Sequence, residues 1–482
     1  MSEDQFFLNG IDGVTGEYLV PPMSAESVAR LIRPLEDREQ SGWLKRLKNL
    51  FSRPFLGLPL DIDPTDVARA GWGVVMSPQT PSDVLSALEP LMAHRRSQVL
   101  ADRCKTLEYR AGENMKDWLK RHGVYAGSVA PTKVPYYLLL IGDPESIPFD
   151  FQYLLDIEYA VGRLCFEYID QYRLYAESVV DYEKAQAAPT SRQIVYWGTR
   201  HPRDRATELS ADFLITPLHQ GLPATADQPE EKAIAGTQGF RSLCLRGREA
   251  TRASLSDVLR PPLGAGRPSF LFTASHGIGW PKGHQNQRIG QGALLCQEWS
   301  GFGSIRPGDY LSGPDIADDA RLHGLVAFLF ACYGAGTPEF DNFLTNRTQG
   351  PVAIADQGFI ASLPQRLLSH PQGGALAVIG HVERAWGYSI RPPGIGAQLV
   401  PFRNCIGRIL MGQPVGHSTR DFSEKYAVLS GDLLQKLDQS QGGAAPSDEG
   451  LAITWIERND AQNYIVLGDP AVRLAVDRLP AS

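Results

Sequence analysis

One cysteine and one histidine stand directly after apolar runs, where their side chains could take part in nucleophilic catalysis. Cys332 follows the run Leu325-Val-Ala-Phe-Leu-Phe-Ala331 and precedes Tyr-Gly-Ala-Gly336. His276-Gly277 follows the run Phe270-Leu-Phe-Thr-Ala-Ser275. A thiol becomes a strong nucleophile when a neighbouring imidazole takes its proton. The pair therefore predicts thiolate chemistry, on condition that the fold brings both residues together.

Each of the two residues also has an ordinary explanation. A lone cysteine most often packs like a small hydrophobic residue, and a lone histidine is more often a hydrogen-bonded core or surface residue. In the catalytic interpretation, His276 takes the thiol proton and returns it to the leaving amine. The main-chain N–H groups of Gly277 and Cys332 would then stabilise the oxyanion. A helix beginning just after Cys332 would lower the pKa of its thiol.

The elements that must position this pair are strands of a parallel sheet. Short apolar runs without alternation indicate strands buried on both faces, and chemistry collects past the carboxyl ends of such strands. Further strands are expected at Trp72–Val75, Tyr136–Ile141, Glu158–Leu164, Ile194–Trp197, Ala375–Ile379 and Tyr464–Leu467, with helices over Ser82–Leu107 and Asp170–Ala187. This alternation predicts an α/β fold with a mostly parallel sheet flanked by helices, beside a smaller related α/β subdomain.

Two boundaries and one internal similarity organise this fold along the chain. The Ala187-Ala-Pro-Thr-Ser191 stretch is a plausible joint, which divides the chain into an N-terminal α/β subdomain (1–187) and a catalytic domain (188–482). Gly142-Asp143-Pro144 and Gly468-Asp469-Pro470 both close apolar runs. They are either equivalent strand ends in two related sheets or simply favourable turn sequences.

Composition and charge indicate the cellular compartment and the kinds of partner that are expected. The 482 residues carry a net charge of −7 without a basic stripe, so nucleic acid is not an expected partner. The six cysteines include no CxxC pair, which favours a reducing compartment. No run is long enough to span a membrane, and the start lacks a basic end followed by an apolar core. A cytoplasmic location is expected.

Other kinds of site are not supported. The histidines form no HExxH or other recognised ligand spacing, so a metal site is not expected. Hydrolysis by Cys332 and His276 requires no cofactor, and none is expected. The glycine-rich stretches after His276 and Cys332 lack the Gly-Lys-Ser/Thr ending of a phosphate loop. The absence of a GxSxG elbow argues against a serine hydrolase.

The arrangement of these motifs resembles the caspase–gingipain clan of cysteine peptidases. An apolar run ending in His-Gly, followed by a run ending in Ala-Cys, is typical of that clan. Several pieces are similar to the gingipain branch, in the same order over about 130–475: Leu140-Ile-Gly-Asp-Pro144, Ala160-Val-Gly-Arg-Leu164, Ala375–Trp386 and Val466-Leu-Gly-Asp-Pro470. The resemblance implies a caspase-like sheet and peptide-bond hydrolysis through Cys332 and His276. Secreted gingipains have a signal peptide that this chain lacks, and residues 1–130 match nothing in the family.

The same resemblance implies candidates for the substrate pocket. Trp386 takes the position of an aromatic pocket wall, although a tryptophan that only packs in a loop is an equal alternative. An acidic residue early in the first helix of the catalytic domain selects Arg or Lys in the gingipain branch. The corresponding segment offers Asp204, Thr207 and Glu208, without an unambiguous match.

Together these features predict an intracellular cysteine endopeptidase that acts on a protein or peptide substrate, with a possible preference for Arg or Lys before the cleaved bond. A catalytically idle scaffold that binds a protein partner is the alternative from another class. Acyl transfer by the same Cys332–His276 pair is a third possibility.

Overall fold

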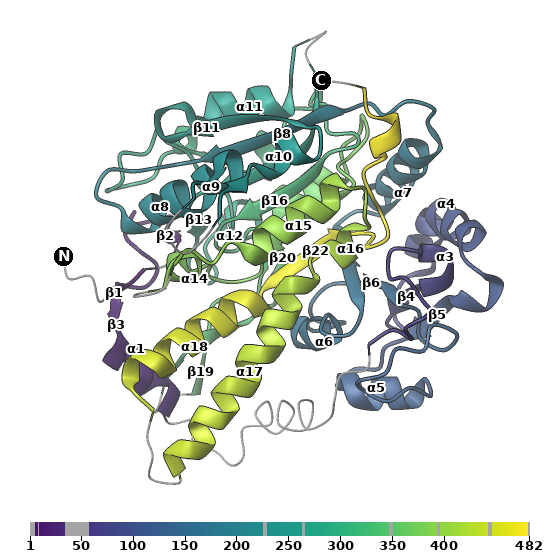
Figure 1. Ribbon diagram of the computed structural model, residues 1–482, viewed down its shortest axis with the longest axis horizontal. Helices are drawn as coiled ribbons and strands as arrows, with labels where there is room; N and C mark the ends of the chain where they lie inside the picture. Colours follow the sequence, from purple (N-terminus) through teal and green to yellow (C-terminus); the bar gives the residue numbers. More distant parts are fainter. Residues whose placement is uncertain are drawn as a thin grey trace.

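The centre of the molecule is a single ten-stranded sheet (Figure 1). The computed structural model describes residues 5–7, 9–33, 57–224, 229–262, 266–346, 350–392, 396–441 and 446–480. The strand order is β11-β8-β12-β16-β21-β22-β7-β6-β4-β5. In chain order these strands are β4 (Trp72–Met76), β5 (Cys104–Glu108), β6 (Tyr137–Ile141), β7 (Ala160–Leu164), β8 (Ser191–Gly198), β11 (Arg241–Arg246), β12 (Pro268–Ala274), β16 (Val326–Phe330), β21 (Ala377–His381) and β22 (Tyr464–Gly468).

The sheet consists of two parallel halves. Strands β11, β8, β12, β16 and β21 are parallel to one another, and so are β22, β7, β6, β4 and β5. The halves meet where β21 and β22 pair antiparallel. The expected α/β class with a mostly parallel sheet is confirmed. Since β22 pairs with β7, residues on both sides of the expected 187/188 boundary share one sheet, and that boundary stays a prediction.

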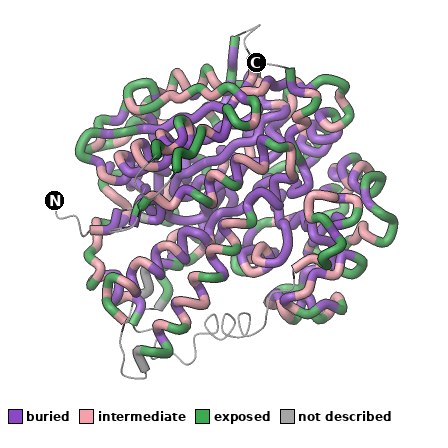
Figure 2. The backbone as a smooth tube through the Cα atoms, in the orientation of Figure 1, coloured by how far each residue is buried: buried purple, intermediate pink, exposed green. Residues whose placement is uncertain are grey.

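Helices cover the sheet, as the burial of its strands requires. Every residue of β6, β7, β12, β16, β21 and β22 is buried, whereas exposed residues lie in the outer helices, the loops and the edge strands β5 and β11 (Figure 2). Among the described residues, no helix is both long and apolar enough to cross a membrane. The longer helices are α1 (Ala25–Ile32), α4 (Ser82–Gln98), α7 (Ile169–Lys184), α11 (Arg252–Leu259), α15 (Val400–Leu410), α17 (Arg420–Gln441) and α18 (Asp448–Gln462).

Aromatic packing fixes the two strands that lead to the candidate site. Phe272 of β12 stacks on Phe328 of β16 with ring centroids 4.8 Å apart. Phe402 of α15 packs edge-on against Phe272 and tilted against Phe328, at 6.2 and 5.8 Å. Such pairs add to the burial of large apolar surface. The ends of β12 and β16 therefore project from a rigid core.

Two expectations about the helices and strands are corrected. The helix expected over Ser82–Leu107 ends at Gln98, because Val99 turns to an extended backbone and Cys104–Glu108 pairs with β4 as the edge strand β5. The two Gly-Asp-Pro turns end β6 and β22, which lie in one sheet with β7 between them rather than in two sheets.

The N-terminal segment, defined as residues 9–20, joins a second, smaller sheet. Its strand β2 (Gly10–Asp12) pairs in parallel with β13 (Gly277–Gly279), the strand that follows His276. This four-stranded sheet has the order β15-β14-β13-β2, with β14 at Leu294–Leu295 and β15 at Tyr310–Leu311. On the far side of the segment, β3 (Met23–Ser24) leads into α1, whose first turn Ser24 caps. The start of the described chain is thus held beside the candidate site.

Candidate active site

His276 and Cys332 follow neighbouring parallel strands. Strands β12 and β16 pair with Ala274 opposite Phe330, and each candidate residue lies two positions beyond that pair. Both side chains have 0% exposure. The main chain of Gly277 lies directly against Cys332, since a Cβ on Gly277 would stand 1.8 Å from the Cys332 carbonyl oxygen. The expectation that the two strands are parallel neighbours is confirmed.

An acidic residue from a third strand end holds the imidazole of His276. Nε2 of His276 lies 2.6 Å from Oδ2 of Asp204, which precedes α8 (Arg205–Ser210) in the loop after β8. Thr207 donates to the same Asp204 oxygen at 2.6 Å, and the Tyr18 hydroxyl donates to the other one. The Tyr18 ring also packs edge-on against the imidazole, at 5.7 Å. Asp204 and Tyr18 together fix the orientation of His276.

This arrangement also fixes the charge and the tautomer. Burial alone would raise the pKa of the Asp204 carboxyl, but His276 and the hydrogen bonds from His276, Thr207 and Tyr18 hold it well below its usual range. An ionised carboxylate only accepts hydrogen bonds, so Nε2 of His276 carries a proton. The other nitrogen, Nδ1, is buried without a hydrogen-bond partner in the described structure. Nδ1 is therefore the nitrogen available to accept a proton.

The Cys332 thiol is closed off at rest. Its Sγ accepts a hydrogen bond from the main-chain N–H of Ala385 at 3.1 Å. Burial raises the pKa of the thiol well above its usual range, against the opposing effect of the Ala385 main chain. The chain after Cys332 turns through Tyr333, at φ 59°, into β17 (Gly336–Thr337), so no helix begins there to lower the pKa. Deprotonation of this thiol requires a base.

The main-chain N–H of Gly277, an expected oxyanion donor, is already in use. It donates to the carbonyl oxygen of Asn9 at 3.0 Å. Asn9 comes from the N-terminal segment, directly before β2. The site is thus occupied by the chain itself, at the position where a substrate carbonyl is expected.

The expected pocket residues lie near one another but have different surroundings. Trp386 follows Ala385, is 1% exposed, and packs its ring 4.4 Å from that of Phe343. Thr207 accepts from the main-chain N–H of His201 at 3.0 Å, in addition to its bond with Asp204. The side chain of Glu208 is 25% exposed and lies 3.8 Å from that of Arg205. Of the two acids, Asp204 is held by His276, which leaves Glu208 as the acid that is partly exposed to solvent.

Sequence reasoning did not assign Asn9, Tyr18 or Ala385 to the site, and it placed Asp204 in the pocket rather than beside His276. One available signal concerned Asp204. It lies just past the expected strand at Ile194–Trp197, and β8 pairs with β12 along Ile194–Gly198, so both strands end at the same edge of the sheet. For the N-terminal residues, neither spacing nor periodicity connects them with His276.

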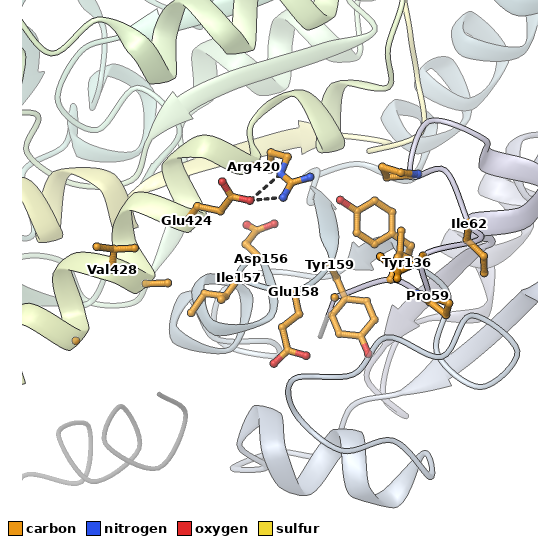
Figure 3. A pocket seen from close by; sticks show the side chains of 16 residues that line it. Pro59, Ile62, Tyr136, Asp156, Ile157, Glu158, Tyr159, Arg420, Glu424 and Val428 are labelled. Atoms are coloured by element: carbon orange, nitrogen blue, oxygen red, sulfur yellow. Dashed lines mark hydrogen bonds and ion pairs between the residues drawn. The ribbon is translucent and has the colours of Figure 1, made fainter. Parts of the chain in front are cut away.

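A large cavity lies elsewhere in the molecule. It has a volume of about 810 Å³ and is lined by residues of 57–64, 136, 156–159 and 420–431, none of them a candidate site residue (Figure 3). The part of the chain that the structure describes holds no cluster of His, Cys, Asp or Glu suited to a metal ion.

Two solved structures show a weak likeness to this chain. No known protein family matches the sequence, and no curated protein matches it. A solved protease structure is 13% identical over 84% of this chain and 78% of its own, with a TM-score of 0.44. The Saccharomyces cerevisiae separase–securin complex is 8% identical over 70% of this chain and 15% of that chain, with a TM-score of 0.30. At TM-scores this low, neither likeness carries weight for function.

Proposed function

We propose that this protein is a cysteine endopeptidase in which Cys332 is the nucleophile and His276 the general acid and base. The observation that carries the proposal is the state of His276. Its Nε2 is fixed by Asp204, its Nδ1 has no partner among the described residues, and it follows the strand next to the one that leads to Cys332. A buried imidazole with one nitrogen anchored and the other unpaired is the arrangement that general-base catalysis needs.

The reaction follows from these roles. His276 takes the proton of the Cys332 thiol, and Sγ attacks the carbonyl carbon of the substrate. The N–H of Gly277 and the main-chain N–H of Cys332 stabilise the oxyanion. His276 then passes the proton to the leaving amine, and water hydrolyses the thioester to restore the thiol. Cys332 and His276 share no hydrogen bond at rest, and such bonds often tighten only when substrate binds.

A preference for Arg or Lys before the cleaved bond stays a prediction with narrow support. It would depend on Glu208, because Asp204 is held by His276, Thr207 and Tyr18. Trp386 borders this region through its neighbour Ala385, which contacts Sγ.

The catalytically idle scaffold is favoured by one specific observation, the complete burial of Cys332 beneath the N-terminal segment. The two functions differ in the reactivity of that thiol once the site is open. A scaffold has no need of a thiol that reacts faster than the other buried cysteines.

The test uses the full chain with a mixed fluorogenic peptide library. We expect Cys332→Ala and His276→Ala to abolish cleavage, while Cys405→Ala, which removes another fully buried thiol on α15, retains it. Iodoacetamide labelling with mass spectrometry measures the reactivity of each thiol. Activity that survives in Cys332→Ala would contradict the proposal. A silent wild type whose Cys332 labels no faster than Cys405 would favour the scaffold.

A further inference from the structure

The main chain of Asn9 makes the contacts of a bound substrate residue. Its carbonyl oxygen accepts from the N–H of Gly277 at 3.0 Å. Its own N–H donates to the carbonyl oxygen of Ala385 at 2.9 Å, and Ala385 also donates to Sγ of Cys332. The residue whose carbonyl occupies the oxyanion position is the one on the acyl side of the bond to be cleaved. In this chain that bond joins Asn9 to Gly10.

Gly10 lies against the nucleophile. A Cβ at this position would be 3.1 Å from Sγ of Cys332 and 2.6 Å from the end of the Leu19 side chain. From Gly10 onward the segment continues as β2, with Gly10, Ile11 and Asp12 opposite Gly277, Ile278 and Gly279. Addition of a strand to an existing sheet is a common way to bind extended peptides. The residues after the bond are thus held by the strand that follows His276.

The side chain of Asn9 is completely enclosed. It has 0% exposure, and neither Oδ1 nor Nδ2 has a hydrogen-bond partner in the described part of the chain. A buried polar side chain without partners calls for a specific explanation. The amide makes no hydrogen bond to a described carboxylate. Asn9 itself is uncharged, so the residue found in the site differs from the Arg or Lys expected before the cleaved bond.

We propose that Asn9–Gly10 is a self-cleavage site: the chain is its own first substrate, and Cys332 cleaves it after Asn9. This inference rests on the proposed peptidase function. Sγ bonds to the carbonyl carbon of Asn9, and the C–N bond to Gly10 breaks. The thiol proton passes through His276 to the Gly10 amine. Water then splits the thioester, which leaves a carboxylate on Asn9 and restores the thiol.

Two consequences follow from the occupied site. Other peptides are excluded while Asn9 holds the N–H of Gly277 and Gly10 covers Sγ, so the uncut chain is inactive toward added substrate. The cut chain then acts on peptide bonds that follow Asn and precede Gly, which replaces the expected preference for Arg or Lys. Because the bond is held in the chain's own site, cutting is intramolecular, and its rate does not depend on protein concentration.

The test follows the full chain over time by intact mass and by sequencing of the new amino terminus. We expect the wild type to yield a chain beginning Gly10-Ile-Asp-Gly at a concentration-independent rate, and Cys332→Ala to stay intact. Asn9→Ala is expected to slow the cut roughly tenfold or more, because the enclosed side chain is what the site recognises. Val14→Ala, at an exposed position of the same segment, is the matched control and cuts normally. Melting temperatures establish that each variant is folded.

Peptides separate failure of this inference from failure of the proposed function. The cut protein is given Gln-Phe-Phe-Leu-Asn-Gly-Ile-Asp-Gly-Val and the same peptide with Arg in place of Asn, and kcat/KM is expected to be roughly tenfold higher for Asn. Cys332-dependent cleavage of library peptides by a chain that stays joined at Asn9–Gly10 would overturn self-cleavage alone. Cleavage of neither chain nor peptides would overturn both. Equal cutting in folded Cys332→Ala would show a spontaneous reaction of the Asn–Gly pair and also overturn the inference.

Discussion

Oδ2 of Asp204 lies 2.6 Å from Nε2 of His276, and both side chains are almost completely enclosed. His276 follows β12, and Asp204 lies in the loop between the adjacent strand β8 and α8, so both residues lie at the same edge of the sheet. The carboxylate keeps a proton on Nε2 and leaves Nδ1 free, which makes the base function of His276 dependent on Asp204.

Replacement of Asp204 by Asn is therefore expected to impair catalysis more than binding. The amide keeps the shape but can donate to Nε2, which would place the imidazole proton on Nδ1. We expect kcat to fall about 10²- to 10⁴-fold with little change in KM, and the acid limb of the pH–rate profile to shift. Asp212→Asn is the matched control, because it removes a carboxylate from the same region that pairs with Arg200 and Arg246 rather than with His276. A kcat within twofold of wild type, with an unchanged pH profile, would show that Asp204 does not position the base.

The parts of the fold that sequence reasoning identified are those whose burial leaves a strong pattern. Strands β12 and β16 read as uninterrupted apolar runs because both of their faces are covered. The edge strands β5 and β11 were missed, since Cys-Lys-Thr-Leu-Glu and Arg-Ser-Leu-Cys-Leu-Arg keep polar residues at partly exposed positions. An edge strand is held by main-chain hydrogen bonds to one neighbouring strand, so its sequence need not be an uninterrupted apolar run.

The contacts of the N-terminal segment could not be predicted from the sequence, for a different reason. Strand β2 has three residues, and its partner β13 is more than 260 residues away in the chain. Its stability comes from main-chain hydrogen bonds and from the fit of Gly10 against Cys332, neither of which imposes a periodic side-chain pattern. Asp204 was singled out by type, but only three-dimensional proximity distinguishes a pocket acid from a partner of His276.

Trp386 combines packing with a position beside the site, and two substitutions separate these roles. Trp386→Ala removes a buried ring that packs on Phe343 and should lower the free energy of unfolding by about 3–5 kcal/mol. Trp386→Phe keeps part of the ring and should fold. We expect the indole to form a wall of the substrate pocket, so this variant should lower kcat/KM roughly tenfold. Trp455→Phe in the same apolar cluster is the control, with a similar stability loss and unchanged kcat/KM. Equal kinetics in both Phe variants would reduce Trp386 to a packing residue.

Glu158 is expected to make the folded protein less stable as the pH rises. It lines the large cavity with Asp156 (Figure 3), and burial raises its pKa to about 7, although the N–H of Gly127 donates to it at 2.8 Å. In the unfolded chain the pKa of this carboxyl is 4.5, so between pH 4.5 and about pH 7 the folded state binds more protons. The free energy of unfolding therefore falls across this window, by up to about 3 kcal/mol from this group.

Urea unfolding at pH 4.5 and pH 7.5 measures this effect, with Glu158→Gln as the test. The variant should lose less stability than wild type over that range. Asp156, whose pKa burial also raises, contributes the same slope to both proteins. Glu230→Gln, at an exposed position, should behave like wild type. Identical pH slopes for wild type and Glu158→Gln would refute the raised pKa.

Gly10→Ala tests how tightly the N-terminal segment closes the site. The added methyl would meet the end of Leu19 at 2.6 Å and Sγ of Cys332 at 3.1 Å, so one of these neighbours or the segment must shift. Overpacking of this kind typically costs 1–3 kcal/mol, which favours local opening of the segment. In a His276→Ala background, which keeps the chain uncut, we expect Cys332 to react with iodoacetamide roughly tenfold faster, because the thiol is exposed more often.

Two further variants assign this effect to the contact itself. Gly236→Ala on α10 (Ile234–Thr237) adds the same methyl where nothing lies within 4 Å, and should leave the labelling rate of Cys332 unchanged. Leu19→Ala removes the nearer of the two side chains that the added methyl would meet. In a Leu19→Ala background, Gly10→Ala should therefore raise the labelling rate of Cys332 by a smaller factor than it does in the presence of Leu19. A labelling rate that rises equally in Gly236→Ala, or that does not change in Gly10→Ala, would mean that the segment does not control access to Cys332. If the labelling rates follow these expectations, the contact that closes the site is that of Gly10 with Cys332. Gly10 is held in this place by β13, the strand that follows His276.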